Sequence, residues 1–143
     1  MKTKTEKKKP KFEDDDHIFV GTFPLICGVN VDLFAMVNDR GNGYCYTHPD
    51  DTHCPRIKVG IARDDWQDVV GVLIHEAMEL CLLVRGLAFT NLASFRTNSD
   101  DRTFIMNHSE FSHMTEYMGQ FLAKALPEIA DVFEKHHKTK KKE

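Results

Sequence analysis

Three ionisable residues interrupt the apolar stretch VLIHEAMELC, namely His75, Glu76 and Glu79. On a helix, residues four apart are offset by only about 40° and roughly 6 Å of rise, so His75 and Glu79 would share one face. Glu76 would lie beside that face. Because burying carboxylates costs about several kcal/mol without a compensating charge, this cluster favours a bound divalent cation.

The spacing is a variant of the H-E-x-x-H zinc helix, in which two ligands stand one turn apart and the intervening Glu takes a proton from metal-activated water. It predicts His75 and Glu79 as metal ligands and Glu76 as the catalytic base. A catalytic zinc needs a third protein ligand, for which His108 and His113 are the candidates. We favour His108, because it lies where an extended segment meets the last helix. Two imidazoles and one carboxylate suit Zn²⁺ and also Fe²⁺ or Mn²⁺.

The alternative is an ordinary structural role, in which His75 is simply hydrogen-bonded and the two glutamates reach solvent or pair with cations. The cations available for such pairs are Arg56, Lys58, Arg63 and Arg85. A second cluster of soft ligands matches no strong zinc spacing, and we interpret it as loop side chains that line a cleft, with a structural metal as the less favoured alternative. Its members are Cys45, His48, His53 and Cys54.

The elements that position these residues can be predicted from composition and periodicity. β-branched, aromatic and alternating residues predict strands over 18–26, 29–37, 44–46 and 56–62. A helix is expected from Asp64 or Asp65 to about Arg85, with Gly86 as its stop. Its apolar residues occupy nearly the whole circumference, which predicts a helix buried on all sides.

A short extended piece is expected over 103–106, followed by an amphipathic helix from Asn107 or Ser109 that Pro127 should kink or split. Together the segments predict an α+β fold. In it, a small antiparallel or mixed sheet packs on the buried metal-site helix and on the C-terminal helix.

Charge divides the 143 residues into a body and two arms. Residues 1–11 carry +5 and residues 134–143 carry +3, so the net charge of −3 leaves −11 for residues 12–133. We expect one domain over 17–134, a disordered charged arm over 1–16 and a basic tail over 135–143. Such an acidic body repels phosphate backbones, so nucleic-acid binding is not our first interpretation.

The compartment follows from the cysteines and from the apolar stretches. Residues 69–84 are the longest nearly apolar run, which is too short and too charged to cross a membrane. The basic N-terminus is followed by the acidic FEDDD rather than by the apolar part of a signal peptide. We therefore expect a cytoplasmic protein whose four cysteines stay reduced.

The predicted strand 56–62, the helix with LIHEAMEL and the later FIMNHSEF together resemble small zincin-like metallopeptidases, particularly those of bacteriophages and prophages. The match covers roughly residues 55–130. The resemblance implies His75, Glu79 and His108 as zinc ligands and Glu76 as the base. It also implies that strand 56–62 lies at the sheet edge and binds substrate backbone by strand addition.

These features predict a zinc-dependent metallohydrolase, most concretely a small metallopeptidase acting on a peptide or protein in the host cytoplasm. Tyr117, His113 and Arg102 are candidate donors to the oxyanion. The alternative is a catalytically silent zincin-fold phage protein that acts as a protein-binding or virion-associated module. A weaker third hypothesis is a nucleic-acid-associated factor that uses the Lys-rich ends.

Overall fold

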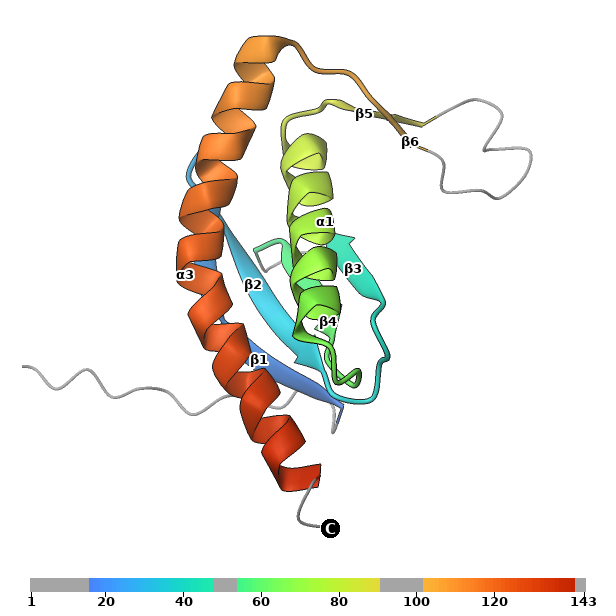
Figure 1. Cartoon of the computed structure of the whole chain (residues 1–143). Helices are drawn as coiled ribbons and strands as arrows, with labels where there is room; N and C mark the ends of the chain where they lie inside the picture. Colours follow the sequence, from blue (N-terminus) through green and yellow to red (C-terminus); the bar gives the residue numbers. More distant parts are fainter. Residues whose placement is uncertain (1–15, 48–53, 91–101, 141–143) are drawn as a thin grey trace, which may run out of the picture.

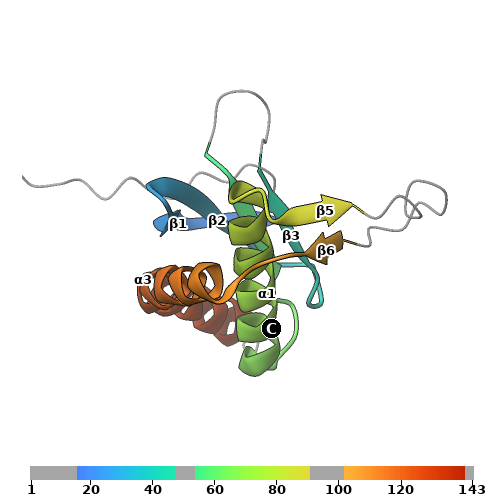
Figure 2. The same cartoon turned by 90° about the horizontal axis from the view of Figure 1, so that it is seen from above.

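A four-stranded sheet carries two helices on one of its faces (Figure 1). The computed structural model describes residues 16–47, 54–90 and 102–140. The strands are β1 (His17–Ile26), β2 (Val29–Met36), β3 (Gly43–Tyr46) and β4 (Arg56–Gly60), in the spatial order β1-β2-β4-β3. The helices are α1 (Trp66–Val84) and α3 (His108–Lys140). Figure 2 shows both helices on the same side of the sheet.

The sheet is mixed and packs on two helices, which confirms the predicted α+β class. β1 and β2 form an antiparallel hairpin, whose turn places Cys27 and Gly28 at positive φ. β2 and β4 are parallel, and β3 pairs antiparallel with β4. Alternate residues of these strands form the core against the helices, among them Val31, Leu33 and Ile57, each fully buried.

The prediction that strand 56–62 lies at the sheet edge is wrong. β4 is flanked by β2 on one side and by β3 on the other, so β3 is the edge strand. The chain passes from β2 through β3 before it returns as β4, and the short β3 takes the outer position. An alternating pattern such as that of Ile57 and Val59 identifies a strand but does not say whether another strand covers it.

Helix α1 begins and ends where the sequence predicts. The Asp65 carboxylate caps it by accepting from the backbone N–H of Gln67 at 2.8 Å, and Gly86 follows the helix with φ of 69°. The expectation of burial on all sides is wrong, because Gly71 and His75 are exposed. α1 therefore packs with one side on the sheet and α3, and it presents the other side to solvent.

Helix α3 is continuous through Pro127, so the expected split is absent, while a kink at this residue stays a prediction. The ring of Pro127 removes one backbone donor, and both this residue and Ala123, whose carbonyl loses its partner, are exposed. Water can satisfy that carbonyl, so the helix is not interrupted. The predicted apolar face is confirmed at its centre, where Phe121 and Ile129 are fully buried.

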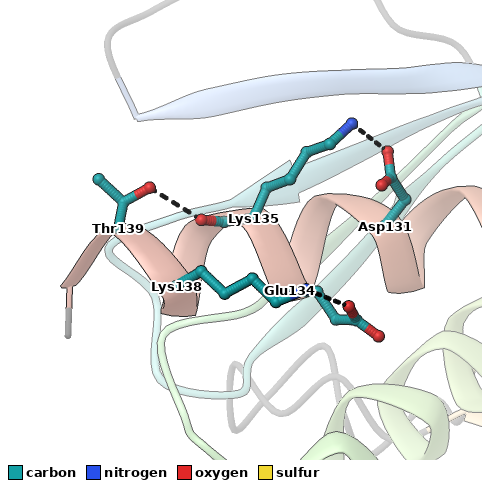
Figure 3. A network of polar contacts seen from close by, with 5 residues as sticks. All are labelled: Asp131, Glu134, Lys135, Lys138 and Thr139. Carbon is teal, nitrogen blue, oxygen red and sulfur yellow. Dashed lines mark hydrogen bonds and ion pairs between the residues drawn. The ribbon is translucent and has the colours of Figure 1, made fainter. Parts of the chain in front are cut away.

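The first part of the predicted basic tail is helical, because α3 runs beyond residue 134 to Lys140. Acid–base pairs one turn apart support these turns (Figure 3), with Lys135 on Asp131 and with Lys138 Nζ 2.8 Å from Glu134 Oε2. The half-buried His137 also lies 2.9 Å from the Ile61 carbonyl oxygen.

Two short strands, β5 (Ala88–Thr90) and β6 (Arg102–Phe104), form a separate antiparallel pair in the connection from α1 to α3. β6 overlaps the predicted extended piece 103–106, whereas β5 was not predicted. Within the described part of the chain, no helix is both long and apolar enough to cross a membrane. The predicted arm 1–16 lies outside the described residues except for Asp16.

Candidate metal centre

A pocket of about 390 Å³ lies between the edge strand β3 and the middle of α1. We call it the carboxylate pocket. The described residues that line it are Gly43, Tyr44, Cys45, Tyr46, His75, Glu76 and Glu79. His75, Glu76 and Glu79, the three residues predicted as a site on α1, therefore line one pocket. Residues of β3, which were not predicted to belong to the site, line it as well.

Gly43 is what allows β3 to approach the helix so closely. A Cβ at this position would lie 2.5 Å from Glu76 Cγ and 2.5 Å from Val72 Cγ1, far inside normal contact distance. Because side chains alternate along a strand, Cys45 points to the same side of β3 as Gly43 and also faces α1. The missing side chain of Gly43 thus brings the Cys45 thiol to the two glutamates.

Three possible ligand atoms converge in the carboxylate pocket. Cys45 Sγ, one carboxylate oxygen of Glu76 and one of Glu79 all lie within 4.8 Å of one another. Ligands of one tetrahedral zinc ion stand roughly 3.5 Å apart, given bonds of about 2.0–2.3 Å. Side-chain movements of about 1 Å would close the group around an ion.

The three acidic groups differ in exposure from the histidine beside them. Glu76 is only 7% exposed, and Cys45 and Glu79 are half-buried. The His75 side chain is 72% exposed, and its Nε2 lies 3.6 Å from Glu79 Oε2. An imidazole at the rim next to Glu79 can rotate toward an ion in the pocket without the cost of being buried.

The structure places the other predicted site residues elsewhere. His108 is the exposed first residue of α3 and is not among the residues lining the carboxylate pocket, so its role as third ligand stays a prediction. His113 and Tyr117, two of the candidate oxyanion donors, line a different pocket. The side chain of Arg102, the third candidate donor, lies outside the described residues, as do His48 and His53.

The second pocket, which we call the Arg85 pocket, lies at the C-terminal end of α1 and has a volume of about 140 Å³. Arg85 Nη2 donates to Glu110 Oε1 at 3.0 Å, and Arg85 Nη1 donates to Cys27 Sγ at 3.6 Å. Burial, assisted by the nearby Cys27, raises the pKa of the Cys81 thiol to about 12. The residues lining this pocket are Ile26, Cys27, Cys81, Leu82, Arg85, Leu87, Glu110, His113, Met114 and Tyr117.

Three of the four cations proposed as structural partners for the α1 glutamates, namely Arg85, Arg63 and Lys58, have other contacts. Arg85 pairs with Glu110, and Arg63 Nη1 pairs with Asp68 Oδ2 at 2.8 Å. Lys58 lies over the ring of Tyr46, on a strand face that points away from α1. Arg85, Arg63 and Lys58 therefore each contact a group other than the α1 glutamates.

Cys45 is the functional candidate that sequence reasoning did not connect to α1. Sequence proximity groups it with Cys54, but of these two described residues the pocket contains Cys45 and not Cys54. In Cys54, burial and a hydrogen bond with Asp32 raise the pKa of the thiol. The available signal was the pattern Gly43-Tyr44-Cys45-Tyr46, in which a small residue and a thiol share one strand face.

Comparison of the chain with models of protein families, with curated proteins and with solved structures gave no match. The carboxylate pocket is therefore the basis for proposing a function.

Proposed function

We propose that the carboxylate pocket binds a divalent metal ion, zinc in the first instance, and that the protein is a metal-dependent hydrolase. The observation that carries the proposal is the convergence of Cys45, Glu76 and Glu79 within 4.8 Å, beside His75. One sulfur and two carboxylate oxygens gathered in so small a space are donors that zinc accepts, and a divalent cation would be attracted by the carboxylates.

The donor set fits a catalytic zinc better than a closed structural one. Cys45, Glu79 and His75 would offer sulfur, oxygen and nitrogen ligands, which zinc accepts, and they would leave a coordination position open. The deeply buried Glu76 would then act as the base, in the role that the sequence predicts for it. In this arrangement Cys45 replaces the predicted His108 as third ligand.

A bound zinc ion would polarise a carbonyl group and lower the pKa of water. Glu76 would accept a proton from the attacking water and pass it to the leaving group. Since Glu76 is 7% exposed, it is shielded from bulk water, which strengthens its electrostatic interaction with charge that develops nearby.

A peptide is the substrate class that we favour, for two reasons. LIHEAMEL resembles the metal helix of zincin-like peptidases, and β3 is an edge strand directly beside the pocket. An extended peptide can pair with such an edge and present its backbone to the site.

All four cysteines of the chain are free, which agrees with a reducing compartment such as the cytoplasm.

The test is hydrolysis of fluorescently labelled casein by the zinc-loaded protein, with Glu76→Gln beside Glu110→Gln. Glu76→Gln should reduce turnover by about 100-fold or more and still bind zinc, because only the base is lost. Glu110→Gln, in the Arg85 pocket, should keep wild-type turnover.

Hydrolysis that survives Glu76→Gln would contradict the proposed mechanism. A wild-type protein that binds zinc and leaves casein and a panel of unstructured peptides intact would favour the silent, protein-binding alternative.

A further inference from the structure

The face of the sheet opposite the two helices, which we call the outer face, carries aromatic and basic side chains at aligned positions. Both helices pack on the opposite side (Figure 2), where Ile57 and Val59 belong to the core. Because side chains alternate along each strand, Arg56 and Lys58 of β4 point to the outer face. The outer face is thus built from the residues between the core positions.

Strand register aligns these side chains in two rows across the sheet. Phe19 of β1 pairs with Phe34 of β2, Phe34 with Lys58 of β4, and Lys58 with Tyr44 of β3. In the next row, Asp32 pairs with Arg56 and Arg56 with Tyr46. Each row therefore contains a cation and ends in a tyrosine at the β3 edge.

The side chains in these rows contact one another. The Phe19 and Phe34 ring centroids are 5.3 Å apart, and the Arg56 guanidinium lies 5.5 Å from the Phe34 centroid. The Lys58 ammonium lies 5.9 Å from the Tyr46 centroid.

The two tyrosines are the exposed aromatic residues of the outer face among the described strands. Phe34 is only 3% exposed, whereas Tyr44 and Tyr46 are 44% and 43% exposed. Residues two apart on a strand stand roughly 7 Å apart, which leaves room for one flat ring system on each tyrosine.

Charge on the outer face does not follow the acidic average of the body. Strands β1 to β4 contain a single carboxylate, Asp32, against the two cations Arg56 and Lys58. Helix α1 alone carries Asp68, Glu76 and Glu79 without any Lys or Arg. The acidic excess among the described residues thus lies on the helices and loops, and the argument from net charge against a phosphate backbone does not hold for this face.

We propose that the outer face binds single-stranded nucleic acid. Bases would stack on Tyr44 and Tyr46, and Lys58 would contact the phosphates between them. Exposed aromatic rings interleaved with cations on an open sheet are suited to unpaired bases, whose faces are free, and not to a duplex, whose bases are stacked on each other. The Lys-rich segments 1–11 and 134–143 add charge that attracts the backbone from further away.

The test is fluorescence anisotropy of the full-length protein with labelled oligonucleotides of roughly 20 residues, oligo(dT), oligo(U) and a matched duplex, at several salt concentrations. Wild type should bind the single strands and bind the duplex at least about tenfold more weakly. The double variant Tyr44→Ala/Tyr46→Ala should lose about tenfold or more in affinity for the single strands. Preference between oligo(dT) and oligo(U) identifies whether the outer face binds DNA or RNA.

Matched controls separate stacking from general charge. Phe111→Ala removes an aromatic ring on α3 that is 47% exposed, and it should leave affinity unchanged. Lys58→Gln should lower the slope of log affinity against log salt by about 0.7, whereas Lys124→Gln on the exposed side of α3 should not. Thermal melting of each variant confirms that it folds.

Three results would overturn the proposal. The first is the absence of single-strand binding at low salt, and the second is binding that the double tyrosine variant retains, which would assign it to the Lys-rich segments. The third is self-association of the wild type that the double variant abolishes, since the outer face would then be occupied by a second copy of the chain.

Discussion

The two pockets beside α1 contain the same kinds of groups and differ in how their charges are balanced. The Arg85 pocket has two cysteines, a glutamate and a histidine, and Arg85 donates to both Cys27 and Glu110. The carboxylate pocket also has a cysteine and a histidine, with two glutamates, and its described lining contains no Lys or Arg.

The two pockets differ in the positive charge that their described lining residues supply. In the Arg85 pocket, a guanidinium of the chain itself provides the positive charge, so the site is complete. In the carboxylate pocket, Cys45, Glu76 and Glu79 are gathered around a space that an ion could enter. Helix α1 thus ends beside the Arg85–Glu110 ion pair, and its middle carries side chains that could hold an ion.

The largest effect that we expect comes from filling the gap that Gly43 leaves. Gly43→Ala should lower the free energy of unfolding by about 1–3 kcal/mol, because its Cβ would collide with Glu76 and Val72. Urea titration followed by circular dichroism measures this change. Gly71→Ala is the control, since nothing lies within 4 Å of its position on α1, and it should raise stability by about 1 kcal/mol. Equal effects of the two variants would mean that β3 does not pack on α1 as described.

A smaller effect concerns pH and the Arg85 pocket. The pKa of the Cys81 thiol is raised from 9.0 to about 12 in the folded protein. Between these values the unfolded chain loses the thiol proton and the folded chain keeps it. Cys81 therefore contributes no pH dependence below about pH 9, and it makes stability fall as the pH rises from there, by roughly 1 kcal/mol per unit at most.

The matched comparison is Cys81→Ala with Cys27→Ala, each against wild type, in urea titrations from neutral to alkaline pH. Cys81→Ala should flatten the alkaline fall in stability. Cys27→Ala should keep most of it, because burial is the larger cause of the raised pKa. An unchanged alkaline slope in Cys81→Ala would show that the thiol is not buried as described.

Local features of the fold could be predicted from the sequence because short-range chemistry determines them. Asp65 and Gly86 mark the ends of α1 through capping and through a positive φ, both of which depend on neighbouring residues alone. The alternation of Ile57 and Val59 predicts a strand with one buried face for the same reason. His75, Glu76 and Glu79 could be placed together because helical spacing fixes their separation.

Features that depend on tertiary arrangement could not be predicted in this way. The parallel pairing of β2 with β4 places β3 at the edge, and no local pattern in Arg56–Gly60 encodes that neighbour. The approach of Cys45 to Glu76 follows from this edge position together with the missing side chain of Gly43. The exposure of Gly71 and His75 could not be predicted, because their apolar neighbours indicate a buried helix. On that side of α1 these neighbours are only half-buried.

The most direct test of the central claim is zinc stoichiometry and affinity, measured by mass spectrometry and calorimetry on the purified full-length chain. We predict one zinc ion per chain in the wild type. Cys45→Ala and Glu79→Gln should lose it, while their counterparts in the Arg85 pocket, Cys27→Ala and Glu110→Gln, should retain it. His108→Ala, measured in the same series, decides whether the predicted third ligand contributes. A wild type that binds no zinc, or that binds it equally well without Cys45 and Glu79, would contradict the assignment of the carboxylate pocket as a metal centre.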